Sequence, residues 1–563
     1  MASLPVTDGG RILTDAWDYK GRPAIRSQTG GWTSASTILV VELNERLTSL
    51  GIAVNLVTYM TGTMHLGNAV AANTVTNFLG TSFILCLLGG FIADTFLGSC
   101  VPSSDSCIPA SGIQLAVLYL ALYMTALGTG GLKSSVSGFG SDQFDESNPW
   151  EKNRMMKFFN YFFFLISLGS LVAVTVLVYV QDNLGRRWGY GICATSILIG
   201  LLVFLSGTRR YRFKKLVGSP LTQIFSVVVV AWRNRRLPLP SEAALLYDVG
   251  EQAKLDGRQG ETKQPLPHTK QFRFLDRAAI KRGEASPPSR WRLNTLTDVE
   301  EVKMVVRMLP IWATTIMFWT VYAQMTTFSV SQATTMDRRV AGSFEIPPGS
   351  LTVFFVLSIL LTVPFYDRLV VPVFRHFTGN SQGLTPLQRI GVGLVLSAMA
   401  MVAAALTEIK RQRVATTVVD PHGPVPMSVF WLIPQFLLVG SGEAFAYIGQ
   451  LDFFLRECPS GMKTMSTGLF LSTLSLGFFL SSALVTIVDR VTGHGGHRSW
   501  LADDLNHGRL YDFYWLLAVL SVLNLIVYLV SARWYVYRER GESPADDGNL
   551  GVELRDAETS HHG

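Results

Sequence analysis

The chain has 563 residues, of which 48% are hydrophobic and only 16% are charged, and its mean hydropathy is +0.29. Soluble domains carry about 25% charged residues, so this composition excludes an ordinary soluble protein and predicts an all-α polytopic membrane protein. The net charge of +7 does not indicate a nucleic-acid partner, because residues 208–303 alone hold 19 Lys and Arg against 10 Asp and Glu. No interleaved basic and aromatic pattern typical of nucleic-acid binding accompanies this surplus.

Apolar stretches long enough to cross a membrane begin near residue 33 and continue to residue 531. Five such spans precede the basic segment 208–303 and six follow it, so eleven spans are predicted. The first 30 residues are polar and contain no apolar core, so no cleavable signal peptide is expected. The predicted spans are 33–60, 74–97, 113–135, 158–180, 189–206, 308–331, 351–373, 387–406, 428–451, 465–488 and 513–531.

The spacing of these spans predicts four parts. Residues 1–207 form an N-terminal helical bundle, 208–303 a basic linker in the form of one loop, 304–538 a C-terminal helical bundle and 539–563 a polar tail. Loops on the cytoplasmic side of membrane proteins carry an excess of Lys and Arg, so we expect the linker and both termini in the cytoplasm. A lipid bilayer is therefore an expected partner.

Three charged side chains interrupt the first span: Glu42, Glu45 and Arg46. A charge at membrane depth costs about 2.5–3.5 kcal/mol, and such residues are usually functional. The i, i+3, i+4 spacing places all three on one helical face, where Arg46 can compensate the carboxylates. A buried carboxylate that gains and loses an arginine neighbour can release and load a proton. The motif predicts proton coupling; the alternative is a structural cluster of ion pairs.

Two further charges stand alone in apolar spans. Lys133 is the only charged residue in 113–140, and Glu443 is the only one in 426–451. Because intramembrane ionisable residues usually have a function, we predict a gating salt bridge between them. The alternatives are a lysine that reaches toward the end of its helix and a buried acid satisfied by hydrogen bonds.

One helix is predicted to be missing from the first half. The motif Gly90–Gly98 ends the second span, and its counterpart Tyr366–Arg368 ends the seventh, as in paired repeats. After its motif, the second half crosses the membrane again through a further span. After its motif, the first half has only residues 99–112 before its next span, and these are mostly polar or small. The charges of the neighbouring loops predict that Gly98 lies on the cytoplasmic side of the membrane and that the next span begins on the external side. An extended segment would leave its backbone unpaired in lipid, so a helix is expected there.

These motifs together resemble the plant nitrate/peptide transporters, the proton-coupled oligopeptide transporter branch of the major facilitator superfamily, and within it the nitrate carriers above all. The resemblance covers nearly everything from residue 15 to 537 and implies twelve helices in two six-helix bundles. Eleven visible spans would then mean that the third helix, about 30 residues with its flanks, is absent. The motifs are Glu42-x-x-Glu45-Arg46, Gly90-x-x-Ala93-Asp94-x-x-x-Gly98, Gly140-Ser-Asp142-Gln-Phe144-Asp145, Phe162-x-x-x-Ile166-Ser167-x-Gly169-Ser170-Leu171 and Gly442-Glu443-Ala444 through Leu451-Asp-Phe453.

The resemblance also implies a substrate wall. Residues 318–327 match the family segment that carries a nitrate-binding histidine, but this chain has Tyr322 at that position. A histidine can become a cation near neutral pH, whereas a tyrosine stays neutral and offers one hydroxyl. The anion would then rely on Tyr322, on Thr326 and on more distant positive charge, with Leu50 and Val54 as apolar lining. The alternative for Tyr322, Leu50 and Val54 is helix packing.

We therefore predict proton-coupled symport of nitrate, and also of chloride, across the plasma membrane at low affinity. Two alternatives stay open: a transport-impaired or regulatory variant that lacks one helix, and a peptide or hormone transporter of the same family. A homodimer is compatible with the sequence. No enzyme is expected, because no nucleophile–base set or phosphate loop is present, and no cofactor or metal site is expected, because His65, His268 and His376 lie scattered in loops and at span ends.

Overall fold

The computed structural model describes residues 12–535 with gaps, and only this part of the chain is discussed below. The predicted missing helix and the Gly90–Gly98 motif lie in the gap at 89–111, outside the described residues. The remaining gaps are 63, 65–66, 146–147, 215–219, 240–245, 248–265, 267, 281–290, 342–343, 379–383, 418–423, 460–462, 494–498 and 503–504.

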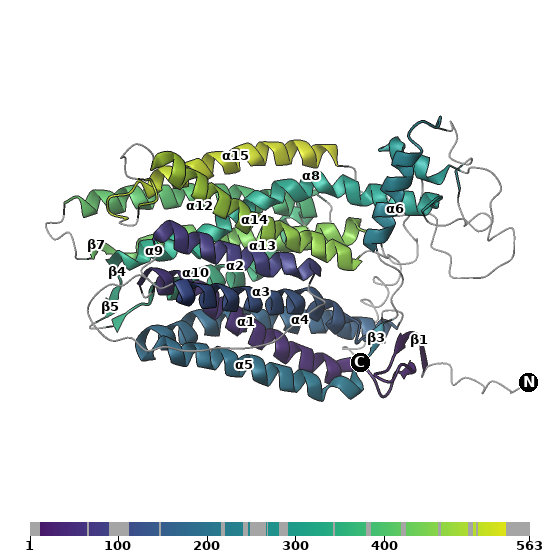
Figure 1. The fold of residues 1–563 in the computed structure, drawn as a ribbon, viewed down its shortest axis with the longest axis horizontal. Coiled ribbons are helices and arrows are strands. Elements are labelled where there is room, and N and C mark those ends of the chain that lie inside the picture. The colour runs from purple at the N-terminus through teal and green to yellow at the C-terminus, as the bar shows by residue number, and fades with distance from the viewer. Residues whose placement is uncertain are drawn as a thin grey trace, which may run out of the picture.

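The described residues of the first half fold into five helical segments that run along one another (Figure 1). The fourth segment continues through two π-helical stretches before the chain turns at Gly185. The segments are α1 (Gly31–Gly62), α2 (Asn68–Leu88), α3 (Gly112–Ser141), α4 (Pro149–Val172) with η1 (Ala173–Leu177) and η2 (Val180–Leu184), and α5 (Arg186–Ser206), which is followed by η3 (Thr208–Arg210).

The second half forms a matching set of long helices. The first of them breaks at Thr327 and the second passes through a π-helical stretch. The helices are α8 (Leu296–Met325), α9 (Phe328–Thr334), η6 (Pro348–Leu351), α10 (Thr352–Phe365), η7 (Tyr366–Val370), α11 (Val371–Thr378), α12 (Pro386–Ala415), η8 (Val429–Leu432), α13 (Ile433–Glu457), α14 (Lys463–Thr492) and α15 (Leu510–Trp534).

Helices cover the described residues of the eleven predicted spans, of which the second is described only as far as Leu88, and this confirms an all-α polytopic membrane protein. By length and apolar composition, eight helical stretches of the described residues can cross a membrane. The number of spans and the domain boundaries stay predictions.

Local sequence signals explain where several helices begin. Asn148 caps α4 through its side chain, which accepts a hydrogen bond from the N–H of Trp150, and Pro149 follows at the first helical position. Thr385 and Gln388 form a reciprocal capping box at the start of α12. Such caps satisfy backbone donors that have no partner inside the helix, and proline at the first position costs no hydrogen bond.

Short strands, which the sequence did not predict, occur outside the bundles. Strands β1 (Ile12–Trp17), β2 (Pro23–Ile25) and β3 (Phe213–Lys214) form an antiparallel sheet in the order β2-β1-β3, with Trp17 opposite both Pro23 and Phe213. The turn between β1 and β2 is held by Asp18, and the backbone N–H of Arg22, which donates to its carboxylate, lowers the pKa of Asp18. The other pairs are β4 (Met336–Asp337) parallel to β7 (Val425–Ser428) and β5 (Arg339–Ala341) antiparallel to β6 (Phe344–Glu345).

The basic linker is more than a loop, so this part of the sequence prediction was wrong. It contains α6 (Pro220–Arg233) and η5 (Arg273–Ala279), which pack on the start of α8 around a common apolar core. The linker and the β1–β3 sheet lie at one end of the bundles, called the linker end below, while β4, β5 and β7 lie at the opposite end (Figure 1). A core of its own fixes the linker to the second bundle.

The described contacts between the bundles include extensive packing of α2 on α14, a hydrogen bond and an apolar cluster. Asn73 in α2 donates a hydrogen bond to the Thr486 hydroxyl in α14 at 2.9 Å. An apolar cluster joins the first bundle to α10 through Val54, Val174 and Val356. Both sets lie beyond Arg46 on the side away from the linker, because α1 runs from the linker end toward the opposite end. The charged motif therefore lies on the linker side of this hydrogen bond and this apolar cluster.

Candidate functional site

The charged motif of α1 forms a compact, unequally exposed group. Arg46 Nε lies 3.0 Å from Glu42 Oε1, with which it makes a hydrogen bond, and 3.5 Å from Glu45 Oε2. The side chains of Glu42 and Glu45 are 3% and 2% exposed, whereas that of Arg46 is 26% exposed. Both carboxylates are thus buried, and Arg46 is the most exposed of the three charged side chains.

Two further donors hold Glu45. The Ser49 hydroxyl, one turn along α1, donates to Glu45 Oε1 at 2.6 Å, and Lys133 Nζ from α3 lies 3.6 Å from the same oxygen. The sequence reasoning missed Ser49, although its i+4 spacing from Glu45 was a usable signal. Lys133 therefore supports the acidic motif within the first bundle in this arrangement.

The predicted salt bridge between Lys133 and Glu443 stays a prediction. Glu443 lies in α13, and its Oε2 atom is buried and accepts no hydrogen bond from any described residue. The charge of Arg46 acts electrostatically on Glu443, and Arg46 in turn interacts with Tyr447, one turn further along α13. Arg46 of the first bundle thus interacts electrostatically with two residues of the second bundle. Tyr447 is a second residue that the sequence reasoning missed.

A glycine lets α4 approach α1 at the level of the charged motif. A Cβ atom at Gly169 would lie 3.0 Å from the Leu43 carbonyl oxygen and 3.2 Å from Arg46 Cβ. Those distances are tighter than ordinary packing, so a side chain there would push α4 away from Arg46. This contact gives a structural reason for Gly169 within the motif that runs from Phe162 to Leu171.

Tyr322 lies on α8 in an aromatic setting that faces the same charges. Its ring packs edge-on against Trp319, Phe355 and Phe478, with centroids 5.5, 5.3 and 6.0 Å away. Arg46 and Glu443 both act on the Tyr322 hydroxyl electrostatically. Tyr322 is therefore a packed aromatic on which the nearby charges act, and its contact with a substrate stays a prediction.

The other predicted wall residues are less accessible. Thr326 is buried at the break between α8 and α9, and its hydroxyl donates to the Ala323 carbonyl oxygen at 3.1 Å. Leu50 and Val54 belong to the apolar cluster that joins the bundles. In this arrangement all three have packing roles, and their contact with a substrate stays a prediction.

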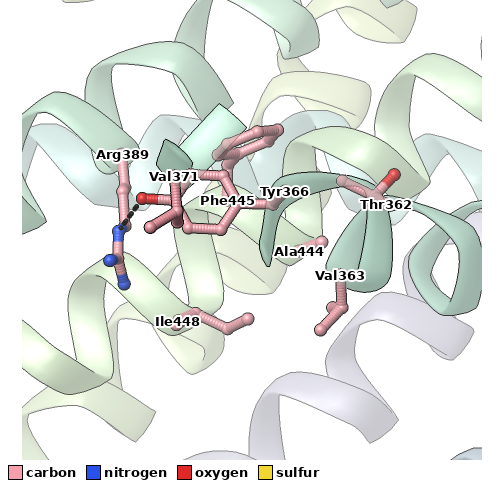
Figure 2. Close-up of a pocket in the computed structure, with 8 residues that line it drawn as sticks. All are labelled: Thr362, Val363, Tyr366, Val371, Arg389, Ala444, Phe445 and Ile448. Atoms are coloured by element: carbon pink, nitrogen blue, oxygen red, sulfur yellow. Dashed lines mark hydrogen bonds between the residues drawn. The ribbon is translucent and has the colours of Figure 1, made fainter. Parts of the chain in front are cut away.

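A cavity of about 370 Å³ lies among α10, η7, α12 and α13, toward the linker end of the second bundle. Figure 2 shows Arg389 pointing toward the hydroxyl of Tyr366, to which its Nε atom donates at 2.9 Å, with Ala444 and Phe445 on the neighbouring wall. Tyr366 opens the Tyr366–Arg368 motif. Its role in the described structure is to anchor α12 to the end of α10.

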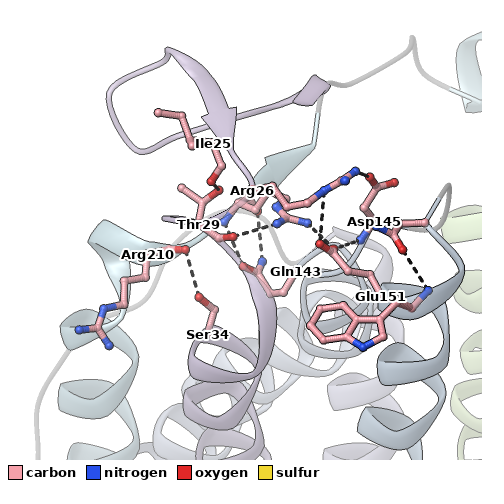
Figure 3. A network of polar contacts seen from close by, with 11 residues as sticks. Ile25, Arg26, Thr29, Ser34, Gln143, Asp145, Glu151 and Arg210 are labelled. Atoms are coloured by element: carbon pink, nitrogen blue, oxygen red, sulfur yellow. Dashed lines mark hydrogen bonds and ion pairs between the residues drawn. The ribbon is translucent and has the colours of Figure 1, made fainter. Parts of the chain in front are cut away.

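A polar network at the linker end explains the motif from Gly140 to Asp145 (Figure 3). Arg26, which follows β2, pairs with Asp145 and with Glu151, and Arg212 Nη1 lies 3.1 Å from Glu151 Oε2. The Gln143 side chain exchanges two hydrogen bonds with the Arg212 backbone, at 3.0 and 3.1 Å. The network ties the start of α1, the α3–α4 loop and the start of the linker into one unit.

His268 joins a cluster that the sequence did not predict. Its Nε2 atom lies 3.1 Å from Asp276 Oδ2, and ligand atoms of His268, Asp276 and Glu300 lie within 4.8 Å of one another. Lys303 Nζ, fully buried, lies 2.6 Å from Asp276 Oδ1 and 2.7 Å from Glu300 Oε1. The lysine ammonium supplies the positive charge between these carboxylates, so the group fits an ion cluster that holds the linker on α8.

Residues 54–501 match the profile of PTR2, the POT family. The chain is 59% identical to the Arabidopsis thaliana protein NRT1/ PTR FAMILY 6.3, covering 98% of each chain. It is 52% identical to NRT1/ PTR FAMILY 6.2 of the same plant, covering 97% of this chain and 99% of the relative. These matches extend through both bundles and the linker.

Solved structures share the fold at low sequence identity. An auto-inhibited POT family peptide transporter superimposes with a TM-score of 0.65 at 20% identity, covering 90% of this chain and 98% of that one. The POT family transporter PepTSo gives 0.63 at 21% identity over 90% and 99%. The paired bundles, the charged α1 motif and these matches agree. The chain belongs to the POT family, whose members are proton-coupled transporters of small solutes and not enzymes.

Proposed function

We propose that the chain is a proton-coupled symporter of nitrate, with chloride as a competing anion, in the plasma membrane. The observation that carries this proposal is Arg46, a partly exposed cation beside two buried carboxylates that also acts on Tyr322 and Glu443 across the bundle interface. A cation held at that place can attract an anion, while the carboxylates beside it take up protons. The nitrate/peptide name of the relative at 59% identity supports the same substrate class.

Charge balance at the site argues for more than one proton in each cycle. Glu42, Glu45 and Glu443 carry three negative charges when ionised, against two positive charges on Arg46 and Lys133. The net charge of these five groups is then −1, and one bound proton brings it to zero. A bound anion adds another negative charge, which a second proton neutralises. Two protons and one anion carry net positive charge inward, which an inside-negative membrane favours by about 2.3 kcal/mol per 100 mV.

The anion is expected between Arg46 and the Tyr322 hydroxyl. Arg46 supplies the charge, and Tyr322 donates one hydrogen bond where a cationic histidine would supply both charge and donor. A neutral donor discriminates less between a planar oxyanion and a spherical halide of the same charge. Low affinity and weak preference for nitrate over chloride follow, with Thr326, Leu50 and Val54 reached only when the bundles separate beyond Arg46.

Lys133 and Glu443 provide the proposed gate. In the described arrangement Lys133 lies by Glu45, while one oxygen of Glu443 lacks a hydrogen-bond partner among the described residues. Protonation of Glu45 would release Lys133, and approach of α3 to α13 would let it meet Glu443. The positive charge of the linker favours a cytoplasmic position for the linker end, so this step would close the cytoplasmic side.

Tyr322→His tests the anion site. Purified protein in liposomes, with an imposed inward proton gradient, is assayed for labelled nitrate and chloride uptake at pH 5.5 and 7.5. The variant is expected to take up more nitrate in acid and to gain preference for nitrate over chloride. Tyr322→Phe is the matched control, since it keeps the ring packing against Trp319, Phe355 and Phe478 and removes only the hydroxyl.

No gain in preference by Tyr322→His would count against the anion site at Tyr322. Uptake that needs no proton gradient would reject symport. Uptake of a labelled dipeptide in place of nitrate would favour the peptide-transporting alternative instead.

A second candidate is a transport-impaired or regulatory variant that lacks one helix. The alignment with the relative of 59% identity spans 594 positions and covers 98% of the 563 residues of this chain, so about 40 of its positions hold no residue of this chain. One spanning helix with its flanks, about 30 residues, would account for most of them. A first bundle without that helix would not seal its pathway.

Restoring a helix between Gly98 and Ser99, with the relative's sequence, tests this second candidate. Nitrate uptake by the restored protein but not by the natural chain would support impairment. Equal, pH-dependent uptake by both proteins would reject it.

A further inference from the structure

Helix α6 of the linker has two apolar faces. One face packs into the linker core through Val227, Val230 and Ala231. The opposite face carries Phe225, Val228 and Trp232, which are 62%, 44% and 68% exposed and follow one another at i, i+3 and i+7. A helix that is apolar on both sides is normally covered on both sides. These three residues and Trp291 are called the outer face of α6 below.

The outer face is fixed in its orientation. Trp291 packs edge-on against Phe225, with ring centroids 6.1 Å apart, and is itself 46% exposed. On the buried side the Ser226 hydroxyl donates to Asn294 Oδ1 at 3.2 Å, and Asn234 Nδ2 donates to the Arg277 carbonyl oxygen at 2.9 Å. Because these bonds hold the other side, α6 cannot turn its outer face inward without losing them.

The helix lies at the level where the second bundle ends. Ile224 packs both on the linker core and on the apolar cluster at the linker end of that bundle. Phe272 of the linker contacts Trp534, the last residue of α15, with ring centroids 6.2 Å apart. Tryptophans concentrate where membrane helices leave the hydrocarbon. Figure 1 shows α6 beside the start of α8 at this end.

Positive charge lies directly beside the outer face. Arg233, Arg235 and Arg236 follow Trp232 and are exposed, and Arg235 Cζ lies 4.5 Å from the Trp232 ring centroid. Arg292 follows Trp291 and is exposed as well. The sequence has no Asp or Glu between Pro220 and Pro240. Exposed aromatic rings flanked by arginine are typical of helices that lie in the headgroup region of anionic membranes.

We propose that α6 lies on the cytoplasmic leaflet, with its outer face at the boundary between headgroups and acyl chains and its arginines bound to anionic phospholipid. The choice of leaflet rests on the proposed orientation of the chain, and no part of the proposal rests on the transported solute. The bilayer would then anchor the linker that the ion cluster around Lys303 attaches to α8.

Spin-label accessibility in the full-length protein tests this surface. Val228→Cys is labelled with a nitroxide in lipid nanodiscs of phosphatidylcholine alone or with phosphatidylserine, and oxygen reports lipid contact while a nickel chelate reports water. Lys270→Cys on the exposed linker and Val527→Cys on the exposed side of α15 are the matched water and lipid controls. Signal from protein without the introduced cysteine is subtracted.

The label at 228 is expected to be as accessible to oxygen and as protected from the nickel chelate as the label at 527. Its accessibility to oxygen should be highest in discs that contain phosphatidylserine. Changing Arg233, Arg235 and Arg236 to Gln should abolish the difference between the two lipid compositions. A label at 228 as open to nickel as that at 270 would overturn the proposal. Protection from both reagents would also overturn it, because a protein surface, such as a second copy, would then cover α6. An unchanged signal at 527 shows that each variant is folded, and no reading depends on nitrate uptake.

Discussion

Ser49→Ala is expected to shift the pH dependence of transport, because Ser49 makes the shortest contact with the Glu45 carboxylate. Its hydroxyl donates at 2.6 Å, whereas Lys133 Nζ and Arg46 Nε lie 3.6 and 3.5 Å from the carboxylate oxygens. The Glu45 side chain is almost fully buried, so water cannot readily replace the lost hydroxyl. Removing a donor from an ionised carboxylate favours its protonated form.

The size of the shift follows from that one hydrogen bond. A hydrogen bond to a charged group contributes about 1.5–3 kcal/mol, and one pH unit corresponds to about 1.36 kcal/mol. Both cations remain in the variant, so the lower end of this range applies. The pH at which uptake is half-maximal should therefore rise by about one unit.

The assay is nitrate uptake into liposomes over a series of external pH values at a fixed membrane potential. Ser49→Thr keeps the hydroxyl and should leave the midpoint unchanged. Thr48→Ala is a second control, since the neighbouring Thr48 hydroxyl donates to the Cys193 carbonyl oxygen and not to a carboxylate. An unchanged midpoint for Ser49→Ala, or a shift toward lower pH, would refute the role given to Ser49. The infrared band of protonated carboxyl groups gives the same titration without transport.

Two further predictions concern packing and the polar network. Gly169→Ala should lower stability by about 1–3 kcal/mol, because its Cβ would crowd Leu43 and Arg46; thermal unfolding in detergent checks this, and Gly191→Ala, whose Cβ would meet nothing within 4 Å, should change little. Glu151→Gln should lower stability by about 3 kcal/mol, because Arg212 would lose its carboxylate partner while its side chain stays 3% exposed. Glu345→Gln, which breaks only the exposed ion pairs with Arg338 and Arg339, should leave the melting temperature nearly unchanged.

Much of the architecture could be predicted from the sequence because hydrocarbon imposes simple rules. Apolar length alone predicted where the membrane helices lie, and helices cover the described residues of every predicted span. The linker was the exception, since α6 is a short apolar helix in a charged segment and its partners, η5 and the start of α8, lie roughly 40 residues or more away in sequence. A short apolar run is ambiguous until its partners are known.

The same distinction applies to the site. Glu42, Glu45 and Arg46 stand out in the sequence because charge is rare in a membrane helix, and their spacing predicts that they meet. Which of the two carboxylates Lys133 approaches was not predictable: it lies by Glu45, and its pair with Glu443 stays a prediction. Tyr447 carries no sequence signal, because a tyrosine in an apolar helix is ordinary.

The sequence by itself determined the membrane class, the positions of the helices and the α1 face on which two acids and one base gather. These follow from local quantities, namely apolar length, charge and the helical repeat. Only the tertiary structure decided that Arg46 is the exposed member of that face, that Glu443 and Tyr322 come to it from the other bundle, and that Leu50 and Val54 seal the interface beyond it. Those results depend on how helices distant in sequence approach one another, and close approach at residues such as Gly169 sets the distances at which charges act.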